Sequence, residues 1–400
     1  MLDRVFSRLT VGIGAGVFGA ASWAAFALSI LLADGMLNPS GGTVGGDFTA
    51  FWTAAKGAAS GAWTTLYDPG AFEAALSEQV MQREKWGLTW QYPPHAALLL
   101  APLGALPYLP GYLLFAGGTL AAFLLTFRRL TGVPLTTLAV IAAAPVLFQT
   151  ALAGQIGTGL GALLLAALLL PDRKPVVAGL CAGLLTIKPQ LGILLPVAYL
   201  SGGHTRAFGT AALTAGALVL ASIAMLGTEA WAAWAAQAFS VAGAVEDYPM
   251  GKMITVYAAL RSAGLPEAVA MTAQALAAAT ALYAAARLWR SAADPVAKAS
   301  LTACLLFLCT PYAYYYDAAI LALPVFYAVT KLEGPAIPER LTLTLIALSP
   351  LWVVQFWEGA GGQIGLCALL ALIVVLVRHQ AQSTSSAASI RSMSAGALSR

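Results

Sequence analysis

Charged residues are scarce in this chain of 400 residues. Asp, Glu, Lys and Arg make up 10% of it, and 60% of the residues are hydrophobic, with a mean hydropathy of +0.79. Soluble domains carry about 25% charged residues. The shortage of charge excludes an ordinary soluble domain and indicates a polytopic membrane protein.

Strand-type alternation is also absent, and cysteine is rare. Only helices or closed barrels satisfy every backbone group in lipid, so the lack of alternation favours helices. The four cysteines lie within apolar segments, without the spacing of a metal site: Cys181, Cys304, Cys309 and Cys367. We therefore expect them to pack, and we expect neither metal nor cofactor.

Apolar segments bounded by charges, Gly or Pro fill most of the chain. They predict an all-α polytopic membrane protein with about 12 transmembrane helices in a single domain, residues 1–379. The tail, 380–400, is Ser-rich without apolar periodicity, so we expect a disordered cytoplasmic end. The segments are roughly 9–33, 110–127, 133–151, 155–170, 175–187, 189–202, 207–227, 266–286, 297–311, 314–330, 340–356 and 362–377.

Arg4 and Arg8 precede the first segment, which is too long for a signal-peptide core. This pattern predicts an uncleaved signal anchor with a cytoplasmic amino terminus. The expected location of the chain is a bacterial inner membrane. With these segments, fifteen of the 21 Lys and Arg residues fall on the cytoplasmic side, as the positive-inside rule expects. The six outer cations are Lys56, Arg83, Lys85, Lys188, Lys252 and Arg261.

Two outer loops are long enough to hold structure, residues 34–109 and 227–265. In the first, we expect a helix from 48 to 61 with Asp47 at its N-cap, and an amphipathic helix from 71 to 86 on the membrane surface. Residues 95–106 are too few to span, so we interpret them as a re-entrant or interfacial segment. The second loop contains a Trp-rich amphipathic stretch.

Lys188 lies between two segments of about thirteen residues each, which are short for a membrane span. The spacing predicts a broken hairpin with Lys188 at its outer end, buried or lining a cavity. An intramembrane Lys is costly without a partner. The predicted topology therefore places the remaining polar residues on the outer face of the membrane, together with a short third loop at 310–317.

Six stretches, in this order, resemble glycosyltransferase family 87. They are GGDFTAFWTAA with LYDP, QYPPHAALLLAPLGALP, GQIGTGLGALLLAALLL, AGLLTIKPQLGILLP and TPYAYYYD, from about residue 45 to 330. This family belongs to the GT-C superfamily, uses polyprenyl-phosphate sugars and includes mycobacterial mannosyltransferases. The resemblance implies a GT-C-like fold, a lipid-linked sugar donor, and a glycolipid or glycan acceptor on the periplasmic side.

The resemblance implies that an Asp of the first outer loop is the general base, and Asp47 matches it. A purely structural N-cap is the alternative for this residue. Cations near the donor phosphate would stabilise the leaving group. The candidates for contact with that phosphate are Lys188, Arg261, Lys252, His95, Tyr315 and Tyr316, and those for sugar or acceptor are Asp317, Tyr92, Gln155 and Glu246.

Tyr315 and Tyr316 stand where many family members carry a His pair. Tyrosine can donate a hydrogen bond to phosphate but carries no positive charge. Mannose is the expected sugar and arabinofuranose the alternative. A transporter or flippase without covalent chemistry is the alternative from another class, because buried ionisable residues also mark transport pathways. No glycine-rich nucleotide loop is present, and we expect no nucleic-acid partner.

Overall fold

The computed structural model describes residues 8–39, 42–61, 66–80, 88–243, 250–331, 343, 347–351, 353, 355–356 and 359–378. Within these ranges every regular element is helical, and extended backbone pairs only in three isolated bridges. The predicted all-α class is confirmed. Arg83, Glu246, the tail 380–400 and parts of the predicted segment 340–356 lie outside the described residues.

The helices follow the predicted segments closely, and several begin at a proline, where a missing N–H costs nothing. The α-helices are α2 (Arg8–Leu31), α3 (Phe48–Ser60), α4 (Pro69–Val80), α5 (Pro94–Leu100), α6 (Tyr108–Thr131), α7 (Leu135–Ala142), α8 (Pro145–Leu152), α9 (Gly157–Leu169), α10 (Pro175–Leu184), α11 (Leu195–Ser201), α12 (Thr205–Gly243), α13 (Val256–Ser262), α14 (Glu267–Arg290), α15 (Pro295–Cys309), α16 (Ala322–Lys331) and Gly361–Arg378. The 3-10 helices are η2 (Ala101–Ala105), η3 (Leu185–Ile187), η4 (Pro189–Leu191), η6 (Met250–Lys252) and η7 (Tyr315–Leu321).

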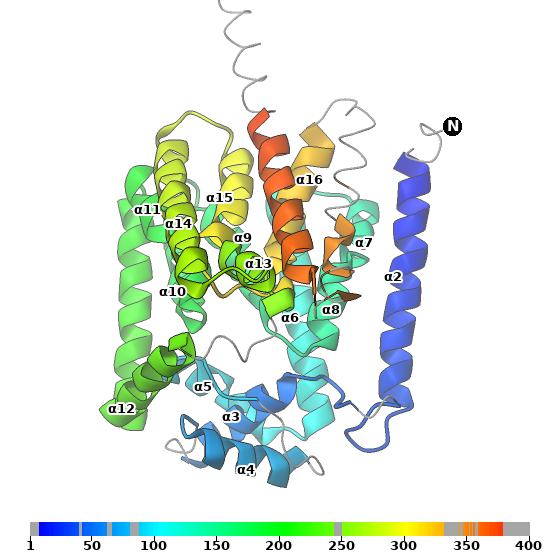
Figure 1. Cartoon of the computed structure of the whole chain (residues 1–400), viewed down its shortest axis with the longest axis vertical. Coiled ribbons are helices and arrows are strands. Elements are labelled where there is room, and N and C mark those ends of the chain that lie inside the picture. Colours follow the sequence, from blue (N-terminus) through cyan, green and yellow to red (C-terminus); the bar gives the residue numbers. More distant parts are fainter. Residues whose placement is uncertain are drawn as a thin grey trace, which may run out of the picture.

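The long helices lie roughly side by side, and α3, α4 and α5 gather at one end of them (Figure 1). Helix α2 begins at the opposite end, where the red helix Gly361–Arg378 also finishes. The first and last described helices therefore begin and end on the same side. This arrangement agrees with an even number of crossings.

Four helices are long and apolar enough to cross a membrane by length and composition: α6, the Thr205–Ala238 part of α12, α14 and Gly361–Arg378. Helices α7 and α8 form a fifth span if the pair, bent by 53°, counts as one. Seven shorter apolar helices accompany them in the described part of the chain. The chain is a polytopic membrane protein, while the count of twelve spans stays a prediction.

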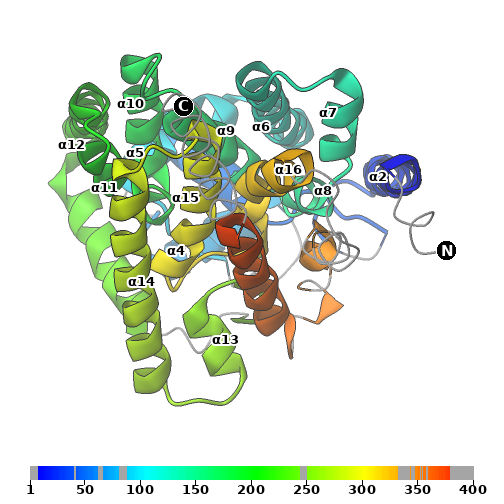
Figure 2. The same cartoon turned by 90° about the horizontal axis from the view of Figure 1, so that it is seen from above.

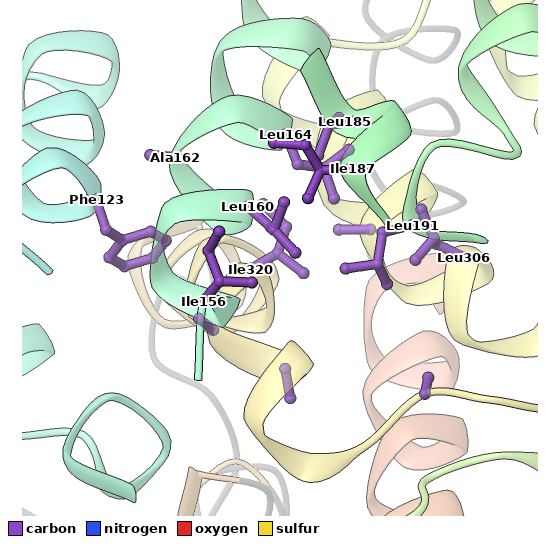
Figure 3. Packing of buried hydrophobic residues seen from close by; sticks show 14 of the residues in the cluster. Phe123, Ile156, Leu160, Ala162, Leu164, Leu185, Ile187, Leu191, Leu306 and Ile320 are labelled. Atoms are coloured by element: carbon purple, nitrogen blue, oxygen red, sulfur yellow. The ribbon is translucent and has the colours of Figure 1, made fainter. Parts of the chain in front are cut away.

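The core forms around α9, which is apolar on all sides and largely buried. Its Leu160 and Leu164 lie among side chains from several other helices (Figure 3). Ile156 and Ile187 belong to this cluster and directly adjoin Gln155 and Lys188 in the chain. The packed core therefore fixes the backbone next to two candidate site residues.

Helices α3 and α4 with η2 form a lobe (Figure 1), which we call the outer lobe because it lies in the first predicted outer loop. The Phe72 and Leu76 side chains, which form an apolar stripe on α4, are buried in the protein core. The apolar side of α4 therefore packs within the protein, and the position of this helix at the membrane surface stays a prediction. A Cβ on Gly104 would meet the α3 backbone at 2.6 Å, so η2 packs directly against α3.

Helix α12 changes direction at Gly227, whose φ of 79° and ψ of 167° are not helical. Beyond this kink the Trp-rich stretch reaches the start of α5. The Trp231 ring stacks on His95 at 5.7 Å, and Trp234 Nε1 donates to the Gln91 carbonyl at 3.1 Å. The second predicted outer loop therefore contacts the chain that leads from the outer lobe into α5.

Candidate active site

A tight turn at Gly45 and Gly46 presents Asp47 at the start of α3. Both glycines have positive φ, 81° and 46°, which suits residues without a Cβ. The Asp47 backbone N–H donates to the Ala153 carbonyl at 2.9 Å. A Cβ on Gly154 would overlap the Gly45 carbonyl oxygen, so the turn lies directly on the loop between α8 and α9.

The Asp47 side chain does not cap α3, although Asp47 occupies the N-cap position. Instead its Oδ2 accepts a hydrogen bond from Gln155 Nε2 at 2.6 Å. The Tyr92 hydroxyl lies 3.3 Å from Gln155 Oε1, to which it donates. The purely structural cap is therefore wrong as an explanation for Asp47, and its carboxylate is oriented by Gln155.

Asp47 is half-buried, and burial raises the pKa of its carboxyl above the usual value. The hydrogen bond from Gln155, and then the positive charges of Lys252 and Lys188, act in the opposite direction on this pKa. A carboxylate whose pKa is raised is a stronger base than an ordinary aspartate. Its partial exposure leaves it open to a reacting hydroxyl.

Lys188 and Asp317 form a buried ion pair. Lys188 Nζ lies 2.6 Å from Asp317 Oδ1 and 2.7 Å from Oδ2, and both side chains are almost fully enclosed. Asp317 Oδ2 also accepts from the Tyr314 backbone N–H at 3.1 Å. The predicted broken hairpin is confirmed, since Lys188 separates η3 from η4 and is 8% exposed.

Tyr316 connects this ion pair to the Asp47 turn. Its ring lies 5.1 Å from Lys188 Nζ, and its carbonyl accepts from Thr150 Oγ1 at 3.1 Å. A Cβ on Gly157 would overlap the same carbonyl. Both clusters therefore rest on the segment from Thr150 to Gly157. Tyr316 also stacks on Tyr314 at 5.1 Å and contacts Tyr315 edge-on at 5.2 Å.

Lys252 reaches this region through pairing of two loops. Met253 bridges to Tyr314, and the Ile254 N–H donates to the Ala313 carbonyl at 2.9 Å. The Lys252 charge is the larger of the two lysine influences on the Asp47 pKa. Lys252 is half-buried. Residues from 47 to 317 in the chain thus gather into one cluster.

His95 is buried in α5 with its Nε2 at 3.3 Å from Thr186 Oγ1. Because Thr186 donates to the Gly183 carbonyl, it must accept from Nε2, which leaves Nδ1 as the unprotonated nitrogen. Burial lowers the His95 pKa below its usual value, so the ring is neutral near pH 7. Thr186 was not predicted, and only its position two residues before Lys188 could have signalled it.

Arg261 belongs to α13, which lies at the rim of the molecule beside α14 (Figure 2). Its Nη1 donates to the Leu265 carbonyl at 2.8 Å, close to the end of its own helix. This contact ties the Arg261 side chain to the turn that follows its helix, and its contact with the donor phosphate stays a prediction. The structure therefore brings together Asp47, Gln155, Tyr92, Lys188, Asp317, Tyr315, Tyr316 and Lys252, with His95 adjacent through Thr186.

Comparison with known proteins gives one match. The model of glycosyltransferase family 87 matches residues 90–311, which is more than half of the chain. No curated protein and no solved structure matches. In the described part of the chain, no group of three or more His, Cys, Asp or Glu residues could hold a metal ion.

Proposed function

The chain belongs to glycosyltransferase family 87, and we propose that it transfers a sugar from a polyprenyl-phosphate donor to an extracytoplasmic acceptor hydroxyl, with inversion. It is a membrane glycosyltransferase. The contact between Gln155 and the half-buried Asp47 carboxylate is the observation that carries the proposed mechanism. Family membership favours this chemistry over transport without bond changes.

In the proposed reaction, Asp47 takes the proton of the acceptor hydroxyl. The acceptor oxygen forms a bond to the anomeric carbon as the bond from that carbon to the phosphate oxygen breaks. The products are the glycosylated acceptor and polyprenyl phosphate, with the proton on Asp47. General-base catalysis of this kind contributes typically about 10²–10⁴-fold. Gln155 acts as the positioning residue, because it holds one carboxylate oxygen and leaves the other for the proton.

The departing polyprenyl phosphate gains negative charge, so nearby cations stabilise the transition state more than the ground state. We assign this role to Lys252 and Lys188. An ammonium has three N–H donors, and two of those on Lys188 are directed at Asp317. The third remains for phosphate. Asp317 thus holds Lys188 in place, in addition to the predicted sugar contact.

Mannose is the proposed sugar, supported by the resemblance to mycobacterial mannosyltransferases, and the acceptor is a glycolipid or glycan. The test is transfer of label from polyprenyl-phosphate mannose and from polyprenyl-phosphate arabinofuranose, by the purified protein in nanodiscs with envelope lipid extract. We expect labelled product from the mannose donor with wild type and none with Asp47→Asn. If only the arabinofuranose donor gives labelled product, arabinofuranose replaces mannose as the proposed sugar. Equal product from Asp47→Asn would remove the base assignment.

A further inference from the structure

A pocket lies on the outer lobe, between α3, α4 and η2. It has a volume of about 550 Å³, which falls within the usual range for small-molecule sites. Its lining residues come from all three helices and include Thr53, Lys56, Phe72, Gln79 and Gly104. The proposed transfer site does not account for this pocket.

The pocket lies away from Asp47. Lys56 is nine residues further along α3, which is about 13 Å at 1.5 Å per residue. Nine residues at 100° each also turn Lys56 to the opposite side of the helix. The Asp47 side chain and the Lys56 side chain therefore face different surroundings, so a ligand in the pocket is a separate ligand.

Two polar atoms at the pocket have no hydrogen-bond partner among the described residues. They are Thr53 Oγ1, on a side chain that is 2% exposed, and Gln79 Oε1. A buried polar group without a partner costs about 1–3 kcal/mol. The hydroxyl can donate or accept and the amide oxygen can only accept, so hydroxyl groups of a ligand would satisfy both.

Lys56 supplies a positive charge at the same pocket. Its Nζ lies 4.3 Å from the centre of the Trp52 ring, and Trp52 is held by a hydrogen bond from Nε1 to the Leu106 carbonyl at 3.0 Å. In the part of the chain that the structure describes, no carboxylate pairs with Lys56. The Lys56 charge is thus available to an anion.

We propose that this pocket binds a phosphate group that carries neighbouring hydroxyls, as in a glycerol phosphate or sugar phosphate. Lys56 contacts the phosphate, as a positioned point charge does. Thr53 and Gln79 contact the hydroxyls. Phe72 and Ala75 provide the apolar wall against which the carbon skeleton rests. This site is independent of the proposed transfer reaction.

Isothermal titration of the full chain in non-ionic detergent tests the site, with sn-glycerol 3-phosphate, inorganic phosphate and glycerol as probes. We expect saturable binding of glycerol phosphate, weaker binding of phosphate and none of glycerol. Lys56→Met keeps the stem over Trp52 and should weaken binding at least tenfold, while Lys56→Arg should retain it. Thr53→Val has nearly the same shape and should weaken binding several-fold. Melting temperatures check that each variant is folded.

Asp47→Asn and the double variant Lys188→Met/Asp317→Asn separate this site from the transfer site, since neither should change the affinity for glycerol phosphate. Binding that survives Lys56→Met but disappears in the folded double variant would overturn the proposal, as would the absence of saturable binding to wild type. Nanodiscs identify the source of the ligand. If the protein binds glycerol phosphate in phosphatidylcholine nanodiscs but not in phosphatidylglycerol nanodiscs, a lipid head group already occupies the site. Equal binding of glycerol phosphate in both kinds of nanodisc would identify the ligand as a soluble phosphate.

Discussion

Gln155 Nε2 donates to Asp47 Oδ2 at 2.6 Å, although 108 residues separate the two in the chain. The backbone repeats the contact, because the Asp47 N–H bonds to the Ala153 carbonyl. The proposed base is therefore held by the loop before α9 and not by its own helix. The proposed base can therefore be tested by substitutions at Gln155 as well as at Asp47.

Asp47→Asn should reduce single-turnover transfer by about 100-fold or more, because the amide cannot take a proton. The Asn oxygen can still accept from Gln155, so donor affinity should be unchanged. Asp68→Asn is a matched control, since Asp68 is exposed in the same lobe and its side chain accepts a hydrogen bond from the Ala71 N–H. Near-normal transfer in Asp47→Asn would instead direct attention to Asp317 or Glu246.

The rate should fall at low pH, as the Asp47 carboxylate takes up a proton. Because burial raises this pKa, the acid limb of the pH–rate profile should lie above the ordinary Asp value of about 3.9. Gln155→Leu removes the hydrogen bond that lowers the Asp47 pKa, so the acid limb should move to still higher pH. A charged hydrogen bond of about 1.5–3 kcal/mol corresponds to a shift of about 1–2 pH units.

A purely structural Gln155 would give a different profile. Gln155→Leu would then reduce the rate equally at all pH values, without moving the limb. Gln155→Glu offers a second comparison, because a carboxylate beside Asp47 raises its pKa through like-charge repulsion. Both substitutions should therefore move the limb in the same direction, by different mechanisms.

Lys188→Met and Asp317→Asn should each destabilise the protein by about 3–5 kcal/mol, since each leaves one buried charge without its partner. The double variant should recover much of this loss, measured by thermal unfolding in detergent. If Lys188 also contacts the donor phosphate, the double variant will be stable yet bind donor weakly. Normal donor affinity in the stable double variant would leave Lys188 with a structural role alone.

Gly154→Ala should displace the turn that carries Asp47, because its methyl group would overlap the Gly45 carbonyl. Gly264→Ala is the control, with a φ of 83° but no atom within 4 Å of its Cβ. The control should lose about 1–2 kcal/mol of stability, from backbone conformation alone, and keep its activity. Gly154→Ala should lose more stability and at least tenfold in single-turnover rate. Equal effects of the two would contradict the close contact.

Membrane orientation is open to cysteine labelling. The Lys252 charge acts on Asp47, so both should lie on the extracytoplasmic side. In a background with the four native cysteines replaced by Ser, Lys252→Cys should react with an impermeant reagent on intact cells. Arg173→Cys and Arg290→Cys should react only after the cells are opened. Labelling of position 252 only in opened cells would invert the proposed topology.

The helix boundaries were accessible from sequence because charges, Gly and Pro mark them clearly. The predicted bounds of α6, α9 and α14 lie within a few residues of the structure. Asp47 at the start of a helix and Lys188 in a broken hairpin were equally readable, since local pattern determines both.

Contacts between helices could not be predicted from the sequence in the same way. Helix α9 is apolar on every side, so no stripe shows how it is rotated or which residues meet Gln155. The stripe of Phe72 and Leu76 shows a related limit, because an apolar face does not say whether lipid or protein covers it. The sequence analysis predicted Gln155 and Asp317 as sugar or acceptor contacts. In the structure, Gln155 is hydrogen-bonded to Asp47, and Asp317 forms an ion pair with Lys188.

The Lys188–Asp317 pair also has a consequence for biosynthesis, because its members are 129 residues apart. At about 5–20 residues per second, Asp317 is synthesised about 6–26 seconds after Lys188. During that interval the hairpin of α10 and α11 carries an ammonium whose counter-ion does not yet exist. The nascent hairpin must therefore keep Lys188 in contact with water, and it can settle into its final depth only after α15 and η7 have followed it into the bilayer.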